Sequence, residues 1–339
     1  MKRAFARWVA FWDARETGES LSLVRILVPL VIAYDLIETA LRGLVMPLWG
    51  ALEHGGMGPA RLDEPICAFY AWFGASPTST WTLFALTVLS AVTMALGLFS
   101  RLSAWTLLVT YAQLAALSPD ADRGIDTLLR NVLLVLALAP IGATWSLDAL
   151  RAEGRLTRDR RVPAWPRYLI VAQLVVLYFF AGMLKQSANW SYAGGYGALF
   201  LVLHKPHFIG VEVPHAWLVA AYPLTQAATF ATVTWERAAI LLPGLLALRG
   251  MARPGRLGAL VNRLRVLEVW VGMGIAFHLA LAVLLALGPF PWGCLALYPA
   301  LAAPRTLRRW ATALGSVRTR RASVPPLLEV ASRTETSDA

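Results

Sequence analysis

The chain has 339 residues, of which 58% are hydrophobic and 15% are charged. Soluble globular domains average about 45–50% apolar residues and about 25% charged residues. This composition excludes an ordinary soluble enzyme. The net charge of +11 would suit a nucleic-acid-binding protein, but the basic residues lie in short segments between apolar runs and at the chain ends. The sequence therefore predicts an integral membrane protein with the lipid bilayer as its surroundings and no nucleic-acid partner.

The first 20 residues carry a helical pattern of apolar side chains. Phe5, Val9 and Trp12 recur at helical spacing in a segment that is otherwise basic. Such a segment is typical of an amphipathic helix that lies in the membrane interface. We predict this helix over residues 1–20, on the cytoplasmic side.

Eight apolar runs follow, most of them close to the roughly 20 residues that a transmembrane helix needs. They are residues 21–42, 78–99, 102–118, 125–143, 166–185, 219–247, 266–287 and 290–304. The pattern predicts an all-α helical bundle with about eight transmembrane helices over residues 21–304. We expect residues 305–339 to form a cytoplasmic tail, basic at first and then disordered.

The charges of the connecting segments predict how the chain is oriented. Arginines are concentrated in the N-terminal arm, around 151–167, around 249–265 and in the tail, whereas the alternate segments carry few of them. Because basic loops stay in the cytoplasm, both ends are predicted to be cytoplasmic. The chain is then a multi-pass protein of the inner (plasma) membrane.

Ionisable residues within the predicted spans are costly to insert, so each is a candidate for function. The topology places five of them in the outer half of the membrane: Asp35, Asp126, Arg130, Lys185 and His278. A sixth, Glu236, lies deep in its run and is expected to pair with a residue of another helix. Arg25 and Glu268 are near the cytoplasmic ends of their helices, where we expect them to reach toward the surface in a structural role.

Each candidate also has a structural interpretation. Asp126 and Arg130 are four residues apart on one helix face and can form an ion pair, structural more often than catalytic. Lys185 can extend to the interface beside Trp190, or it can be partly removed from water and act as a base. His278 can line a pocket or simply bond a backbone carbonyl.

Neither cysteines nor histidines match a known metal motif, and no metal is predicted. Cys67 and Cys294 are isolated, so unpaired thiols are favoured over a single bridge. His204, His207 and His215 share one predicted outer loop, but their spacing indicates solvated side chains.

The segment from residue 178 to residue 206 resembles the vitamin K-dependent gamma-carboxylases and their bacterial relatives, the HTTM (horizontally transferred transmembrane) domain proteins. Its matching residues are Tyr178, Phe179, Ala181, Gly182, Lys185, Trp190 and Gly194 or Gly195. Segments 22–35 and 124–150 and the Phe-His pair 277–278 are similar too, in the same order.

The resemblance implies that Lys185 is the base that deprotonates a quinol, with Tyr178 and His278 as pocket candidates. It further implies reduced vitamin K or menaquinol as cofactor, oxygen and carbon dioxide as co-substrates, and a small secreted peptide as partner. A cavity lined by Lys185 and His278, of at least roughly 300 Å³, is then expected on the outer side.

The sequence also departs from the carboxylase pattern. Leu184 stands where the carboxylases have the first of two adjacent lysines, and Asp126 follows Gly124 and Ile125 where they have a histidine. The sequence ends after a short tail where they have a large lumenal region. The alternative is therefore a non-catalytic protein of the same fold, acting in maturation, export or immunity for a secreted peptide; a transporter is disfavoured because no internal repeat is visible.

Overall fold

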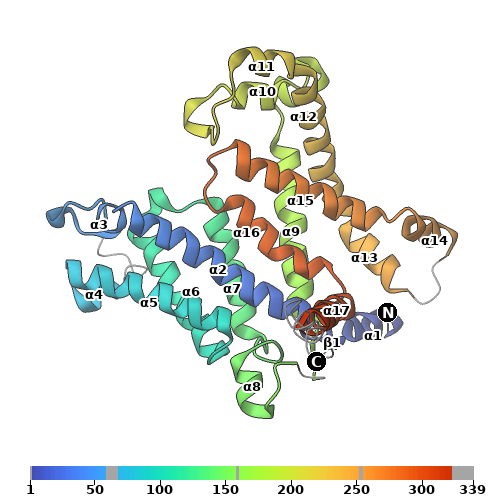
Figure 1. Ribbon diagram of the computed structural model, residues 1–339, viewed down its shortest axis with the longest axis horizontal. Helices are drawn as coiled ribbons and strands as arrows, with labels where there is room; N and C mark the ends of the chain where they lie inside the picture. The colour runs from blue at the N-terminus through green and yellow to red at the C-terminus, as the bar shows by residue number, and fades with distance from the viewer. Residues whose placement is uncertain (1, 59–67, 158–159, 252–254, 323–339) are drawn as a thin grey trace, which may run out of the picture.

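The structure, a computed structural model, describes residues 2–58, 68–157, 160–251 and 255–322. It is a bundle of helices joined by short loops (Figure 1). Two short strands, β1 (Arg15–Thr17) and β2 (Arg161–Pro163), pair antiparallel. The predicted all-α membrane fold is therefore confirmed.

Long helices of the bundle are connected by shorter ones along the chain. In the first half the helices are α1 (Lys2–Trp12), α2 (Glu19–Leu41), α3 (Val45–Trp49), α4 (Ala68–Phe73), α5 (Pro77–Leu96), α6 (Ser100–Leu117), α7 (Gly124–Leu138) and α8 (Leu147–Glu153). In the second half they are α9 (Trp165–Leu184), α10 (Ala198–Val202), α11 (His215–Ala220), α12 (Tyr222–Arg237), α13 (Leu242–Gly250), α14 (Arg256–Arg263), α15 (Val266–Leu284), α16 (Phe290–Leu297) and α17 (Pro304–Ala322).

Within the described part of the chain, five helical segments are long and apolar enough to cross a membrane. They are Glu19–Leu41, Pro77–Leu96, Trp165–Leu184, Tyr222–Gly250 and Arg256–Leu284. The other three expected spans form α6, α7 and α16. With 15 residues, α7 is shorter than the roughly 20 that a bilayer core requires. The total of about eight spans stays a prediction.

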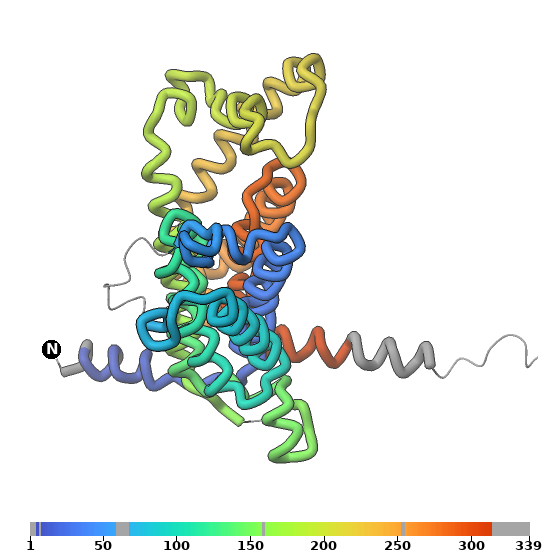
Figure 2. Tube along the Cα trace, turned by 90° about the vertical axis from the view of Figure 1, so that its left-hand side faces the viewer, coloured from blue at the N-terminus to red at the C-terminus, as the bar shows by residue number. Residues whose placement is uncertain are grey.

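Eight further helices fall into two groups on opposite sides of the bundle. In Figure 1, α8, α17, α1 and α14 lie from the bottom edge round to the right, whereas α3, α4, α10 and α11 lie from the left edge to the top. Figure 2 shows α10 and α11 at one end and α8 at the other, with α1 and α17 pointing in opposite directions. The basic segments thus share one side, as the charge pattern predicts. That this side faces the cytoplasm stays a prediction.

The core is centred on α2, which packs against α5, α9 and α16. Val24, Val28 and Ile32 recur every four residues on one face of α2, and all three are fully buried. This spacing produces a continuous apolar stripe along a helix. The core also includes α6 and α7, which follow α5 and pack against each other, and it extends to buried residues of α12 and α15.

Arg25 corrects one expectation about the core. It does not extend to the surface but is completely buried. Its Nη1 donates to the carbonyl oxygens of Met94 and Ala95, at 2.9 and 2.8 Å, and its Nη2 donates to that of Trp145. Carbonyl groups in the last turn of a helix have no partner within the helix, so the end of α5 binds the guanidinium. Arg25 is thus held inside the bundle instead of extending to the surface.

The first part of the predicted tail is helical. Residues from Pro304 onward form α17, which packs against α2, and Arg308 Nε donates to Oε1 of the buried Glu19 at 2.5 Å. This ion pair holds the first part of the predicted tail against the bundle. The predicted disordered stretch, 325–339, lies outside the described residues.

Candidate functional site

Lys185 and Glu236 form an ion pair between α9 and α12. Lys185 directly follows α9, and its Nζ donates to Oε1 and Oε2 of Glu236 at 2.8 and 2.7 Å. Nζ also donates to the carbonyl oxygen of Ala181 at 3.3 Å. The lysine side chain is 21% exposed and the glutamate side chain 5%. The prediction that Glu236 pairs across helices is therefore confirmed.

A glycine allows the two helices to come this close. A Cβ atom at Gly182 would lie 2.9 Å from Cβ of Glu236, closer than real Cβ contacts, and 3.0 Å from the backbone nitrogen of Arg237, which is tighter than most of them. The contact is reinforced by Arg237, whose Nε donates to the carbonyl oxygen of Gly182 at 3.1 Å. Gly182 thus sets the separation at which Lys185 reaches the carboxylate.

A cavity of about 500 Å³ adjoins this ion pair. Lys185, Glu236 and Trp190 supply its polar corner, and most of the remaining wall is apolar. Small side chains of α12 and α15 face it and leave the space open: Ala228, Ala231, Ala276 and Ala280. Leu199 and Val202 of α10 also line it, so α10 covers one part of the cavity.

Two tryptophans join α12 to α15 at one end of the cavity. The indole Nε1 of Trp235 donates to the carbonyl oxygen of Trp270 at 2.9 Å, and Nε1 of Trp270 donates to that of Trp235 at 3.1 Å. The two rings are stacked, with centroids 4.9 Å apart. Both indole N–H groups are buried and satisfied. The sequence does not predict this reciprocal bond, because nothing local in the chain indicates that the two tryptophans meet.

Trp190 lies beside the lysine rather than serving only as a membrane-interface residue. The Nζ of Lys185 is 5.2 Å from the centroid of the indole ring, within the range of a cation–π contact. Trp190 itself belongs to a short 3₁₀ turn, Ala188–Trp190, that follows α9. The turn after α9 therefore places an aromatic face over the amine.

A family model described as HTTM domain matches residues 15–218 of the chain. The chain belongs to the HTTM domain family. This domain is found in vitamin K-dependent carboxylase-related proteins, and the helices described above make the chain a multi-pass membrane protein. Lys185 lies within the matched residues, whereas Glu236 and His278 lie beyond them. No solved structure matches the chain.

Tyr178 and His278 of this HTTM protein contact each other, and neither lines the cavity. The expectation that Lys185 and His278 line one cavity is therefore wrong. The hydroxyl of Tyr178 lies 2.7 Å from His278 Nε2, and both residues are buried. Trp235 and Phe277, which line the cavity, lie with their ring centroids 6.3 and 5.1 Å from that of the histidine. His278 thus lies behind the aromatic wall.

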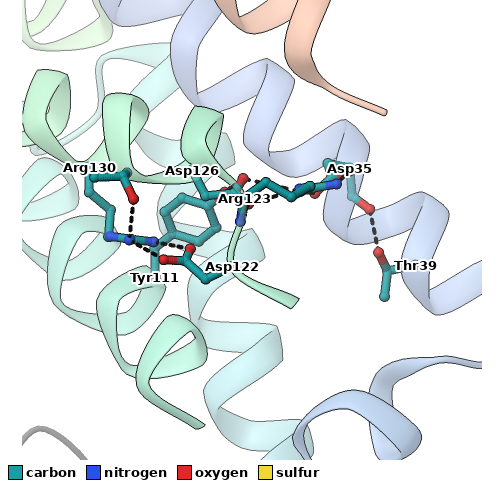
Figure 3. Close-up of polar contacts among 8 residues, drawn as sticks. Asp35, Thr39, Tyr111, Asp122, Arg123, Asp126 and Arg130 are labelled. Atoms are coloured by element: carbon teal, nitrogen blue, oxygen red, sulfur yellow. Dashed lines mark hydrogen bonds and ion pairs between the residues drawn. The ribbon is translucent and has the colours of Figure 1, made fainter. Parts of the chain in front are cut away.

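A second polar cluster joins α2, α6 and α7, as Figure 3 shows. Arg123, just before α7, donates from Nη1 to Oδ1 of Asp35 at 3.1 Å and from Nε to Oδ2 of Asp126 at 2.8 Å. The hydroxyl of Tyr111 donates to Oδ1 of Asp126 at 2.6 Å. Although burial acts in the opposite direction, hydrogen bonds to the two carboxylates raise the pKa of Arg123. In this HTTM chain, Asp126 of the cluster lies in the stretch where the sequence departs from the carboxylase pattern.

The predicted pair of Asp126 with Arg130 is wrong. Arg130 instead donates to both carboxylate oxygens of Asp122, at 2.7 and 2.6 Å. Asp126 is in the first turn of α7, and its Oδ2 accepts from the backbone N–H of Arg123 at 2.9 Å. A carboxylate that turns back to cap the start of its helix points away from a residue one turn further along. Arg130 therefore binds the aspartate of the preceding loop.

The six residues predicted from the sequence as outer or deep polar groups thus fall into separate places. Asp35, Asp126 and Arg130 belong to the second cluster, Lys185 and Glu236 to the cavity, and His278 to the core behind it. Among the cysteines, Cys294 is buried and free, whereas Cys67 lies outside the described residues. Within the described ranges, no group of three or more histidine, cysteine or acidic side chains is arranged to hold a metal.

Proposed function

We propose that this protein is a membrane enzyme with carboxylase-like chemistry and that Lys185 is its catalytic base. The observation that carries the proposal is the cavity beside the Lys185–Glu236 ion pair. Its volume of about 500 Å³ falls within the roughly 300–1,000 Å³ of small-molecule sites. Apolar walls with a single polar corner suit a lipid-soluble aromatic ring that carries a hydroxyl group.

The ion pair provides a way for the lysine to become a base. Removing two opposite charges from water is costly, so in apolar surroundings the neutral form of such a pair becomes accessible. A proton that moves from Nζ of Lys185 to Oε2 of Glu236, across the 2.7 Å hydrogen bond, leaves a neutral amine and a neutral acid. The amine can then accept a hydroxyl proton at the cavity wall.

The cavity fits the group that the family resemblance implies, a reduced vitamin K or menaquinol. When bound, this quinol would supply an acidic hydroxyl group and, with oxygen and carbon dioxide as co-substrates, the driving force for carboxylating a glutamate of a small secreted peptide. Trp190 and Phe277 would contact its ring, and the small side chains of α12 and α15 would leave room for it. Lys185 would hold and move the proton. We place the site on the outer side of the inner membrane.

A specific observation favours a second candidate, a non-catalytic HTTM protein acting in maturation, export or immunity for a secreted peptide. All three hydrogens of the Lys185 ammonium group have acceptors, two on Glu236 and one on Ala181. A lysine bound in this way needs no catalytic role, because its hydrogen bonds already join α9 to α12. In some proteins, buried polar groups specify how helices associate.

One substitution distinguishes the two candidates. Lys185→Arg keeps a positive charge for Glu236, but arginine does not give up its proton. In proteoliposomes supplied with reduced menaquinone, oxygen and bicarbonate, we expect Lys185→Arg to lower quinol oxidation by roughly 10²-fold or more. Lys205→Arg, which changes an exposed lysine of the loop after α10, is the matched control and should retain activity.

Two results would overturn the enzyme proposal. The first is a Lys185→Arg protein that oxidises the quinol as fast as the wild type. The second is a wild-type protein, correctly folded in the same proteoliposomes, that neither oxidises quinol nor incorporates labelled carbon dioxide into peptide. The second result would favour the non-catalytic candidate.

A further inference from the structure

Two imidazole rings meet between α10, which covers part of the cavity, and α11. His204 lies just after α10, and His215 is the first residue of α11. The Nε2 atom of His204 lies 3.1 Å from Nδ1 of His215, and the two ring planes are steeply inclined to each other. Both side chains are exposed. The fold thus brings together two histidines that are 11 residues apart in the sequence.

One of the two rings is held in a defined orientation. The Nδ1 atom of His204 is 2.7 Å from the carbonyl oxygen of Phe200, one helical turn earlier. Because that oxygen can only accept, the proton of the neutral ring is on Nδ1, and the lone pair of Nε2 points toward His215. A ring N–H bonded to a backbone carbonyl is the arrangement that orients histidine ligands in metal sites.

The distance between the two nitrogens is close to what a shared cation requires. Two histidine nitrogens bound to one tetrahedral zinc ion, each at about 2.0–2.1 Å, lie roughly 3.3 Å apart. The observed 3.1 Å differs from this by a few tenths of an ångström, which small ring movements supply. Nδ1 of His215 can bind the cation only if the ring proton moves from Nδ1 to Nε2. Solvent water can exchange this proton, and the ring stays neutral.

We propose that His204 and His215 together bind a divalent transition cation of the kind that imidazole prefers, such as Zn²⁺ or Cu²⁺. In the part of the chain that the structure describes, no third histidine, cysteine or acidic side chain joins them. Water, or a carboxylate of another molecule, completes the coordination. Such a site binds and releases its cation more readily than a closed structural zinc site does.

The cation would tie α10 to α11 above a small apolar cluster. Leu203, Leu218 and Leu285 form that cluster; Leu203 directly precedes His204, and Leu218 follows His215 on α11. Because Leu199 and Val202 of α10 line the cavity, a bound cation would stiffen the cover of the cavity. This inference goes beyond the proposed function, since it holds whether or not the protein is an enzyme.

The test is a zinc titration of the full-length, tag-free protein in detergent micelles, measured against a fluorescent zinc chelator. We expect one Zn²⁺ per chain in the wild type, and at least about tenfold weaker binding in His204→Gln and in His215→Gln. His207→Gln, which removes a histidine of the same loop, should bind as the wild type does. Lowering the pH from about 7.5 to about 5.5 should release the ion, because protons compete for the ring nitrogens.

Two measurements keep the proposal falsifiable if a variant is poorly folded. Cu²⁺ bound to the wild type should give an electron paramagnetic resonance spectrum with coupling to two imidazole nitrogens. Zn²⁺ should slow hydrogen exchange in α10 and α11 of the wild type and of His207→Gln. Unchanged zinc affinity in His204→Gln, equal weakening in His207→Gln, or a copper spectrum without the two nitrogens would each overturn the proposal.

Discussion

Gly182 of α9 lies against Glu236 of α12 so closely that no side chain fits between them. A Cβ atom at the glycine would be 2.9 Å from Cβ of the glutamate. The same glycine accepts a hydrogen bond from Arg237 through its carbonyl oxygen. The placement of the ion pair therefore depends on a residue that takes no part in it, and this can be tested by substitution.

Gly182→Ala should separate α9 from α12 and lower the free energy of unfolding by about 1–3 kcal/mol, the usual cost of overpacking. Gly244→Ala in α13 is the control, because a Cβ atom there meets nothing within 4 Å. The control should be neutral or slightly stabilising, since alanine is the better helix former. Unfolding in mixed detergent micelles measures both. Equal stabilities of the two variants would contradict the close approach.

The buried ion pair should show strong energetic coupling. Lys185→Met leaves the carboxylate of Glu236 buried without its partner, and we expect a loss of about 3–5 kcal/mol. The double substitution of Lys185 and Glu236 by methionine should cost less than the sum of the two single changes, since it leaves no unpaired charge. A thermodynamic cycle over the four proteins measures the coupling. Additive effects would show that the pair is not formed.

The partner of Arg130 can be identified in the same way. We expect a coupling energy of about 1 kcal/mol between Arg130 and Asp122, which are partly buried and bonded through two oxygens. The coupling between Arg130 and Asp126 should be smaller, because Arg123 holds that carboxylate. Two double-mutant cycles, with each aspartate changed to asparagine and Arg130 to glutamine, provide the comparison. The reverse order of the two couplings would restore the pairing expected from sequence spacing.

Asp148 of α8 predicts a dependence of stability on pH. Its Oδ2 accepts from the backbone N–H and the hydroxyl of Ser100 at 2.7 and 2.6 Å, and Oδ1 accepts from the backbone N–H of Phe99. Burial acts in the opposite direction, but these hydrogen bonds hold the pKa of the Asp148 carboxyl below its ordinary value. The pKa in the folded state is thus below that of the unfolded chain, which is about 3.9.

The carboxylate therefore stabilises the fold at neutral pH, and this contribution is lost as the pH falls through the folded-state pKa, below about pH 4. We expect Asp148→Asn to be less stable than the wild type at neutral pH and the difference to narrow below about pH 4. Thermal unfolding at several pH values measures it. Asp120→Asn, at an exposed aspartate, should show little difference at any pH, and a constant difference for Asp148→Asn would refute the prediction.

The helices could be predicted from the sequence because a bilayer demands long apolar runs, and these are visible in the sequence alone. The bounds of most long helices agree with the expected apolar runs to within a few residues; this holds for α2, α5, α9 and the α12–α13 segment. The α14–α15 segment begins about ten residues before its expected run. The strand pair β1–β2 was not expected, because three-residue strands leave no pattern that distinguishes them from loops. The sequence does not predict that α17 packs against α2. The segment is rich in arginine, and such a segment reads as a solvated tail.

The site could be predicted only in part. The sequence identifies Lys185 as a candidate, and it predicts for Glu236 only a partner on some other helix, because packing decides which helices meet. Arg130 was assigned to the wrong aspartate because residue spacing ignores helix capping. The alanines of α12 and α15 were a usable signal for the cavity, since small side chains on two facing helices leave space between them.

The bond between Trp235 and Trp270 has a mechanical consequence. Because α12 and α15 are joined near one end, they can separate only by rotating about the two tryptophans. Residues far from the tryptophans then move most, and residues near them move least. Glu236 is the neighbour of the joint, whereas Ala228 and Ala280 are further from it. Substitutions at the distant residues would therefore change the width of the cavity, while the Lys185–Glu236 ion pair keeps its position.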